Sequence, residues 1–83
     1  MNLEIGQYIF FKDTEFLVCD IKIYNNEKYV LLYNEKADKV SIYNIIKDKS
    51  GWRFIRVKDE NLFNKLIILF SDYEKYIKGD NDE

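Results

Sequence analysis

The side chains that most often carry enzyme chemistry are nearly absent from this sequence. The chain has 83 residues, no histidine and a single cysteine. Without histidine there is no usual general base, no Ser–His or Cys–His nucleophile pair and no imidazole ligand for zinc. One cysteine can build neither an internal disulfide nor a zinc or iron–sulfur site. We therefore expect no bound metal and no other cofactor.

Carboxylates are the remaining candidates for acid–base chemistry, and two pairs are close in sequence. Asp13 and Glu15 flank a predicted turn, and Asp59 and Glu60 open a predicted helix. Acidic side chains at turns and helix starts stabilise the local backbone without any catalytic role. The sequence therefore predicts a protein that is not an enzyme and has no catalytic residues.

Positive charge is concentrated in the segment 47–58, which reads KDKSGWRFIRVK. This segment has a net charge of +4, whereas the other residues together carry −6. Strand alternation places Trp52, Phe54, Arg56 and Lys58 on one face, and Arg53, Ile55 and Val57 on the other. If Ile55 and Val57 face the core, the first face is an exposed aromatic and basic surface. The candidate binding residues are Trp52, Phe54, Arg56, Arg53, Lys47, Lys49 and Lys58.

Such a surface fits two kinds of partner. Protein interfaces are enriched in Trp, Tyr and Arg, which favours a protein-interaction module or regulator, such as a phage or mobile-element inhibitor of a host protein. Aromatic side chains also stack on bases beside cations, which favours weak nucleic-acid binding through the hairpin 47–58. The structural alternative is that Trp52 and Phe54 are core residues beneath a helix and that the lysines are merely solvated.

Five β-segments are predicted to position this surface. They span 8–11, 16–23, 28–33, 39–46 and 52–57, and they are rich in Val, Ile, Tyr and Phe. Turn residues separate them at 13–14, 25–26, 34–38 and 48–51. Short connections between successive strands predict a five-stranded antiparallel meander, with an SH3-like small barrel as the alternative.

The segment 16–23 is apolar on both faces at its start. Alternation predicts one apolar face, which consists of Leu17, Cys19, Ile21 and Ile23, and Phe16 and Val18 on the other. A strand buried on both faces at one end is typical of a sharp bend in a barrel or coiled sheet. Free cysteines are among the most buried residues, so Cys19 is expected in the core.

The hydrophobic period then changes to that of a helix. From Leu62 onward apolar residues recur every three or four positions, which predicts a helix at about 60–78 with a wide apolar face. Asp59 is its predicted N-cap and Gly79 its C-cap. We expect one α+β, mainly β domain at 1–79, with the helix packed on the sheet, and a disordered acidic tail at 80–83.

Cellular setting and origin follow from composition. The apolar run Leu66–Phe70 is too short to span a membrane, and the first residues lack the pattern of a signal peptide. We expect a cytoplasmic protein without membrane contact. Lysines outnumber arginines eleven to two, which indicates an AT-rich bacterial or phage genome.

The stretch 16–70 resembles a family of short bacterial proteins known as domain of unknown function 1292. The matching features are Phe16-Leu17-Val18 with Ile21, Tyr29-Val30-Leu31-Leu32, Val40 with Ile42, the Asp48 to Gly51 turn, Phe54, Val57-Lys58-Asp59-Glu60, and Phe63, Ile67 and Phe70. The basic hairpin and the strand at 8–11 depart from the family pattern. The resemblance implies a small bacterial protein of unknown function and no catalytic residue.

Overall fold

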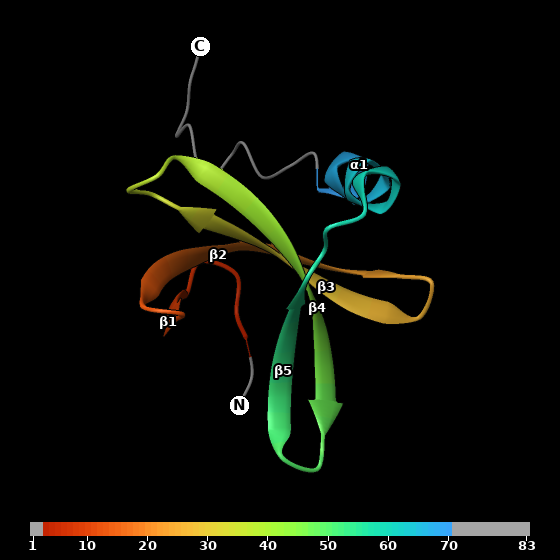
Figure 1. The fold of residues 1–83 in the computed structure, drawn as a ribbon, viewed down its shortest axis with the longest axis horizontal. Coiled ribbons are helices and arrows are strands. Elements are labelled where there is room, and N and C mark those ends of the chain that lie inside the picture. The colour runs from red at the N-terminus through yellow and green to blue at the C-terminus, as the bar shows by residue number, and fades with distance from the viewer. Residues whose placement is uncertain (1–2, 71–83) are drawn as a thin grey trace.

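A computed structural model describes residues 3–70 of the chain. Five strands precede one helix: β1 (Tyr8–Phe11), β2 (Thr14–Tyr24), β3 (Glu27–Asn34), β4 (Lys39–Asp48), β5 (Gly51–Arg56) and α1 (Glu60–Leu69). The strands pair antiparallel in chain order, β1-β2-β3-β4-β5 (Figure 1). This confirms the predicted fold class, a mainly β meander with one C-terminal helix.

Two tight turns show why the sequence folds into hairpins. Lys12 and Asp13 have φ angles of 54° and 59°, and Asn25 and Asn26 have 52° and 64°. Two successive left-handed residues make the type I′ turn, whose twist matches that of the flanking strands. Asparagine and aspartate tolerate this conformation better than most residues, which explains the predicted turn at 25–26. The turn predicted at 13–14 lies one residue earlier, because Thr14 already belongs to β2.

Hydrophobic residues pack on both faces of the sheet. The helix-side core consists of Leu17, Cys19, Tyr29, Leu31, Ile42, Leu66 and Phe70. The inner core, on the opposite face, consists of Phe16, Val18, Val30, Leu32, Tyr43 and Ile45. Because Leu66 of α1 and Phe70, which follows the helix as its C-cap, belong to the first cluster, the helix covers one face of the sheet, as predicted.

The inner core joins the two edge strands through side chains. The Phe11 ring of β1 lies 5.2 Å from the Phe54 ring of β5 and 5.4 Å from the Tyr43 ring of β4, measured between centroids. The backbones of β1 and β5 do not pair. The sheet therefore curls into a half-barrel, which lies between the predicted open meander and the predicted SH3-like barrel.

A β-bulge in β2 changes which residues face the helix. The pairing register with β3 shifts between Val18 and Asp20, so Cys19 is the extra residue. The prediction that Ile21 and Ile23 share a face with Cys19 is wrong, because the bulge moves Ile21 to the inner core and leaves Ile23 70% exposed. A bulge bends its strand and increases its twist, which explains the bend that the sequence predicted.

The start of α1 agrees with the sequence, and its described end comes earlier than expected. Asp59 is the N-cap, and its Oδ1 accepts hydrogen bonds from the backbone N–H of Asn61 (2.8 Å) and Leu62 (3.2 Å). The helix ends at Leu69, because Phe70 has the non-helical angles φ −92° and ψ 26°. The remainder of the predicted helix, 71–78, the Gly79 cap and the acidic tail lie outside the described residues. Within residues 3–70, no helix is long and apolar enough to cross a membrane.

Cys19 is a core residue, as predicted, and its burial should make it unreactive. Its side chain is fully buried, and its thiol donates to the backbone oxygen of Leu17 at 3.7 Å. Burial, with a smaller contribution from the Asp20 charge, raises the pKa of the Cys19 thiol from 9.0 to about 11. Since the thiolate is the reactive form, the folded protein should resist alkylation at pH 8.

We expect iodoacetamide to leave Cys19 unmodified in the native protein and to modify it fully in urea, as measured by mass spectrometry. The unfolded chain also loses this proton at lower pH than the folded chain, so stability should fall as pH rises from about 9 to 11. Rapid alkylation without denaturant would contradict this packing.

Candidate functional site

The β4–β5 hairpin carries most of the predicted binding residues and projects away from α1 (Figure 1). Its register pairs Lys47 with Trp52 and Tyr43 with Arg56. Directly opposed residues of an antiparallel pair share a face, and alternate residues of one strand do so too. Trp52, Phe54, Arg56 and Lys47 therefore lie on one face, the face of the inner core.

Neither predicted arrangement of β5 is fully correct. Trp52 and Phe54 are partly buried against the inner core, so they do not form a freely exposed aromatic surface. They also do not lie beneath the helix, because α1 covers the opposite face, where Val57 packs. Ile55 is 42% exposed rather than buried. A curled sheet with a core on each face leaves β5 no face that is wholly buried or wholly solvated.

Two lysines lie over the Trp52 ring. The Nζ atoms of Lys47 and Lys28 are 5.6 Å and 5.9 Å from its centroid, within the range of cation–π attraction. Lys28 comes from β3 and reaches this face because it pairs with Ile45, which pairs with Phe54. Sequence reasoning missed Lys28, because its place depends on the β3–β4 register. We call Lys28, Lys47, Trp52, Phe54 and Arg56 the hairpin surface.

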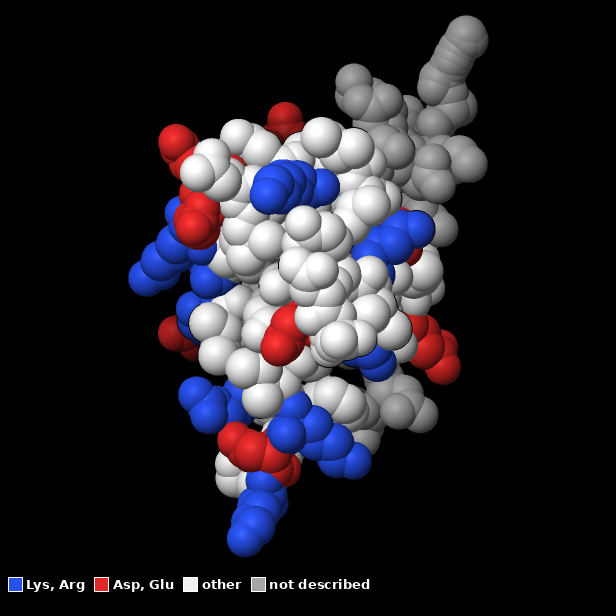
Figure 2. Space-filling model, turned by 90° about the vertical axis from the view of Figure 1, so that its right-hand side faces the viewer, with Lys and Arg blue, Asp and Glu red and all other residues white. Residues whose placement is uncertain are grey.

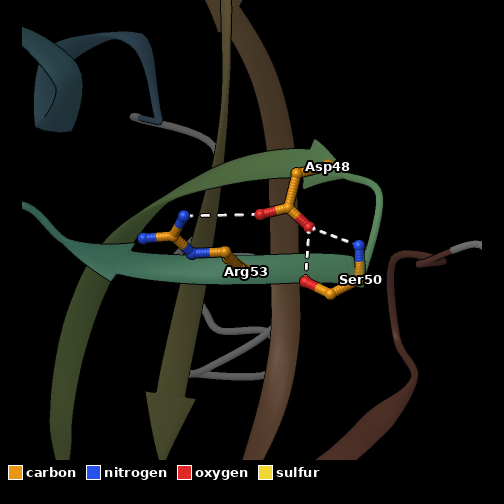
Figure 3. A network of polar contacts seen from close by, with 3 residues as sticks. All are labelled: Asp48, Ser50 and Arg53. Carbon is orange, nitrogen blue, oxygen red and sulfur yellow. Dashed lines mark hydrogen bonds and ion pairs between the residues drawn. The ribbon is translucent and has the colours of Figure 1, made fainter.

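The only acid of the hairpin is held on the other face (Figure 3). Oδ1 of Asp48 accepts hydrogen bonds from the Ser50 backbone N–H (2.9 Å) and hydroxyl (2.7 Å), and Oδ2 lies 3.3 Å from Nη1 of Arg53. The hydrogen bonds from Ser50, together with the Arg53 guanidinium, lower the pKa of the Asp48 carboxyl. Asp48 and Arg53 therefore offset each other, and the charged groups on the hairpin surface are all cations.

The remaining predicted site residues lie outside the hairpin surface. Arg53 is on the opposite face with Asp48, and Lys49 is exposed in the turn. Lys58 follows β5 and lines a shallow groove beside Phe63 of α1. The space-filling view shows several Lys and Arg side chains around an acidic group at the lower end of the molecule, where the hairpin lies, and other basic side chains further up (Figure 2). The segment 47–58 gives this end a net positive charge, although only part of the segment belongs to the hairpin surface.

The arrangement is suited to binding. The hairpin surface offers a partly buried aromatic centre, three cations and no carboxylate partner for them among residues 3–70. Within the same residues, no three acidic, cysteine or histidine side chains gather closely enough to hold a metal ion.

Comparisons with known proteins give no indication of function, so any proposal must rest on the site described above. No family model matches the chain, and no curated protein or solved structure matches it. The resemblance to the short bacterial family therefore stays a prediction.

Proposed function

We propose that this protein is a non-enzymatic protein-interaction module whose hairpin surface binds an acidic region of another protein. One observation carries the proposal: Lys28 and Lys47 lie over the ring of the partly buried Trp52, and Arg56 lies on the same face of the sheet, while the hairpin's only acid is paired with Arg53 on the other face. Tryptophan and arginine are enriched in protein interfaces, and a surface whose charged groups are all cations is complementary to an acidic partner. The proposed setting is the cytoplasm of a bacterium or phage-infected cell, where the protein acts as a regulator.

The geometry favours a protein partner over a nucleic acid. A base stacks on an exposed aromatic face, but two lysine ammonium groups lie over the Trp52 ring, and Phe54 packs against Phe11 and Tyr43. Side chains already held in place lose little conformational freedom on binding, which supports their use as interface anchors. Nucleic-acid binding through the basic hairpin is the alternative, and nuclease treatment distinguishes it from protein binding.

Charge reversal on the hairpin surface should abolish partner capture. The test compares affinity capture from a lysate of the native host by the wild-type chain, by Lys47→Glu/Arg56→Glu, and by Lys39→Glu/Lys65→Glu. The last variant makes the same charge change at exposed lysines elsewhere. We expect at least one protein that the wild type and the control retain, and that the hairpin variant retains about tenfold less, because close interfacial charges contribute more than 1.4 kcal/mol.

Nuclease treatment and folding controls separate the outcomes. Far-UV circular dichroism should be unchanged in both variants, because the substituted side chains are exposed. Capture that disappears after nuclease treatment would assign the surface to a nucleic acid instead. Identical partners for the wild type and the hairpin variant would remove the hairpin surface from the binding site.

A further inference from the structure

A second candidate surface lies away from the hairpin, where β1, the start of β2 and the loop 34–38 enclose a groove of about 560 Å³. Tyr8 pairs with Leu17, which pairs with Tyr33, so these residues share the face that α1 covers further along the sheet. Its lining includes the aromatic residues Tyr8, Phe10 and Tyr33 and the acidic residues Glu15 and Glu35. None of them belongs to the hairpin surface.

Two aromatic side chains of the groove are exposed without a role in the core. Phe10 is 71% exposed and Tyr8 is 49% exposed, whereas their neighbours Ile9 and Phe11 pack on the inner core. Alternation along β1 explains the contrast, because the outward positions point to the helix-side face beyond the reach of α1. Large exposed aromatic groups beside a groove are typical of a contact surface.

The groove is also acidic. Asp13, Glu15 and Glu35 line it, against a single lysine, Lys36. Within residues 3–70, none of these three carboxylates forms an ion pair. They therefore have no cationic partner to displace when a positively charged ligand arrives.

The tyrosines of the groove act as donors to acids at its rim. The Tyr8 hydroxyl donates to Glu35 at 3.1 Å, and the Tyr33 hydroxyl donates to Asp38 at 2.7 Å. These hydrogen bonds are the largest cause of the raised pKa of Tyr8 and of Tyr33, so both hydroxyls stay protonated at neutral pH. The tyrosine hydroxyls therefore hold these two carboxylates in fixed orientations at the groove.

We propose that this groove binds an extended, arginine-bearing segment of a partner protein. A guanidinium group can form paired hydrogen bonds to a carboxylate while its plane lies on an aromatic ring. The groove supplies both groups, with Glu15 and Glu35 for the charge and Phe10 and Tyr8 for the ring faces. This site has the opposite charge to the hairpin surface, so it takes a different segment and does not depend on the function proposed above.

Fluorescence anisotropy with a labelled peptide of alternating glycine and arginine tests the site on the full chain. The matched peptide carries citrulline in place of arginine, which keeps the shape and removes the charge. We expect the arginine peptide to bind the wild type about tenfold more tightly than the citrulline peptide, as loss of a charge-assisted hydrogen bond implies. Glu15→Gln/Glu35→Gln and Phe10→Ser should each weaken arginine-peptide binding about tenfold by the same reasoning.

The control variant is Glu27→Gln/Glu60→Gln, which makes the same charge change outside the groove and should bind the arginine peptide like the wild type. The hairpin variant Lys47→Glu/Arg56→Glu should not weaken binding of the arginine peptide, because the hairpin surface lies outside the groove. A negative result for the groove can therefore be distinguished from a negative result for the hairpin surface. Three results would overturn the proposal. The wild type does not bind the arginine peptide, the citrulline peptide binds as tightly as the arginine peptide, or the control Glu27→Gln/Glu60→Gln weakens binding as much as Glu15→Gln/Glu35→Gln does.

Two other occupants would also overturn it. Self-association in sedimentation that Glu15→Gln/Glu35→Gln abolishes, without peptide binding, would assign the groove to a second copy of the chain. Nuclear magnetic resonance shifts at residues 71–83 caused by Phe10→Ser, again without peptide binding, would assign it to the chain's own C-terminal segment.

Discussion

Replacing Phe70 with alanine is expected to lower the free energy of unfolding by about 3–5 kcal/mol, the range for a large-to-small change of a buried aromatic residue. Phe70 is fully buried in the helix-side core, where it packs with Leu66 against residues of β2, β3 and β4. The substitution leaves a cavity and removes the contact that the residue after α1 makes with the sheet. Urea denaturation followed by far-UV circular dichroism measures the loss.

The adjacent residue provides the control. Leu69 is 41% exposed and is not part of the helix-side core, so Leu69→Ala should cost less than about 1 kcal/mol. Similar losses for the two variants would mean that Phe70 does not fix α1 to the sheet and does not belong to the helix-side core.

Replacing Phe11 with alanine should have the second largest effect, a loss of about 2–4 kcal/mol, because the side chain is only partly buried before truncation. The Phe11 ring contacts the rings of Phe16, Tyr43 and Phe54 at centroid distances of 5.0, 5.4 and 5.2 Å. The contact with Phe54 joins β1 to β5 through side chains, since the two edge strands share no backbone pairing. Thermal or urea unfolding of the purified variant gives the size of the loss.

Phe10→Ala is the matched control, because Phe10 is the same residue type on the same strand but is 71% exposed. Its expected cost is within about 0.5 kcal/mol, the usual range for an exposed site. Trp52 fluorescence should shift in Phe11→Ala and not in Phe10→Ala, since both Phe11 and Trp52 pack on the inner core. Equal destabilisation by the two substitutions would contradict the half-barrel.

Local signals predicted most of the fold. The Asn25-Asn26 turn and the Asp59 cap each specify their own backbone through hydrogen bonds and left-handed geometry within a few residues. The strand order followed from short connections. The bulge at Cys19 was not predictable in this way, because alternation assumes one residue per step and nothing in the sequence 16–23 marks an extra one.

The candidate site was predicted only in part, and for a similar reason. Trp52, Phe54, Arg56 and Lys47 share a face because they lie on one hairpin, and this could be read from alternation. Lys28 lies beside them because β3 pairs with β4 so that Lys28 is opposite Ile45. The sequence of the loop 34–38 does not specify this register, so the position of Lys28 could not be predicted. The degree of burial of Trp52 depends on the curl of the whole sheet, which is a tertiary property.

The groove residues also come from distant segments. The segment 8–15 contains both exposed rings and two of the acids, but the third acid, Glu35, meets Tyr8 across 27 positions of sequence. Only the folded sheet brings them together. A chain with a slightly negative net charge of −2 can thus present two surfaces of opposite sign.

The most direct test of the account is lysine footprinting on the complex with the captured partner. The central claim is that the hairpin surface contacts that protein. Acetylation of the free and bound chain, followed by mass spectrometry, should show Lys28 and Lys47 modified several-fold more slowly in the complex, with Lys39 and Lys65 unchanged. Protection of Lys39 or Lys65 without protection of Lys28 and Lys47 would contradict the claim and place the interface elsewhere on the molecule.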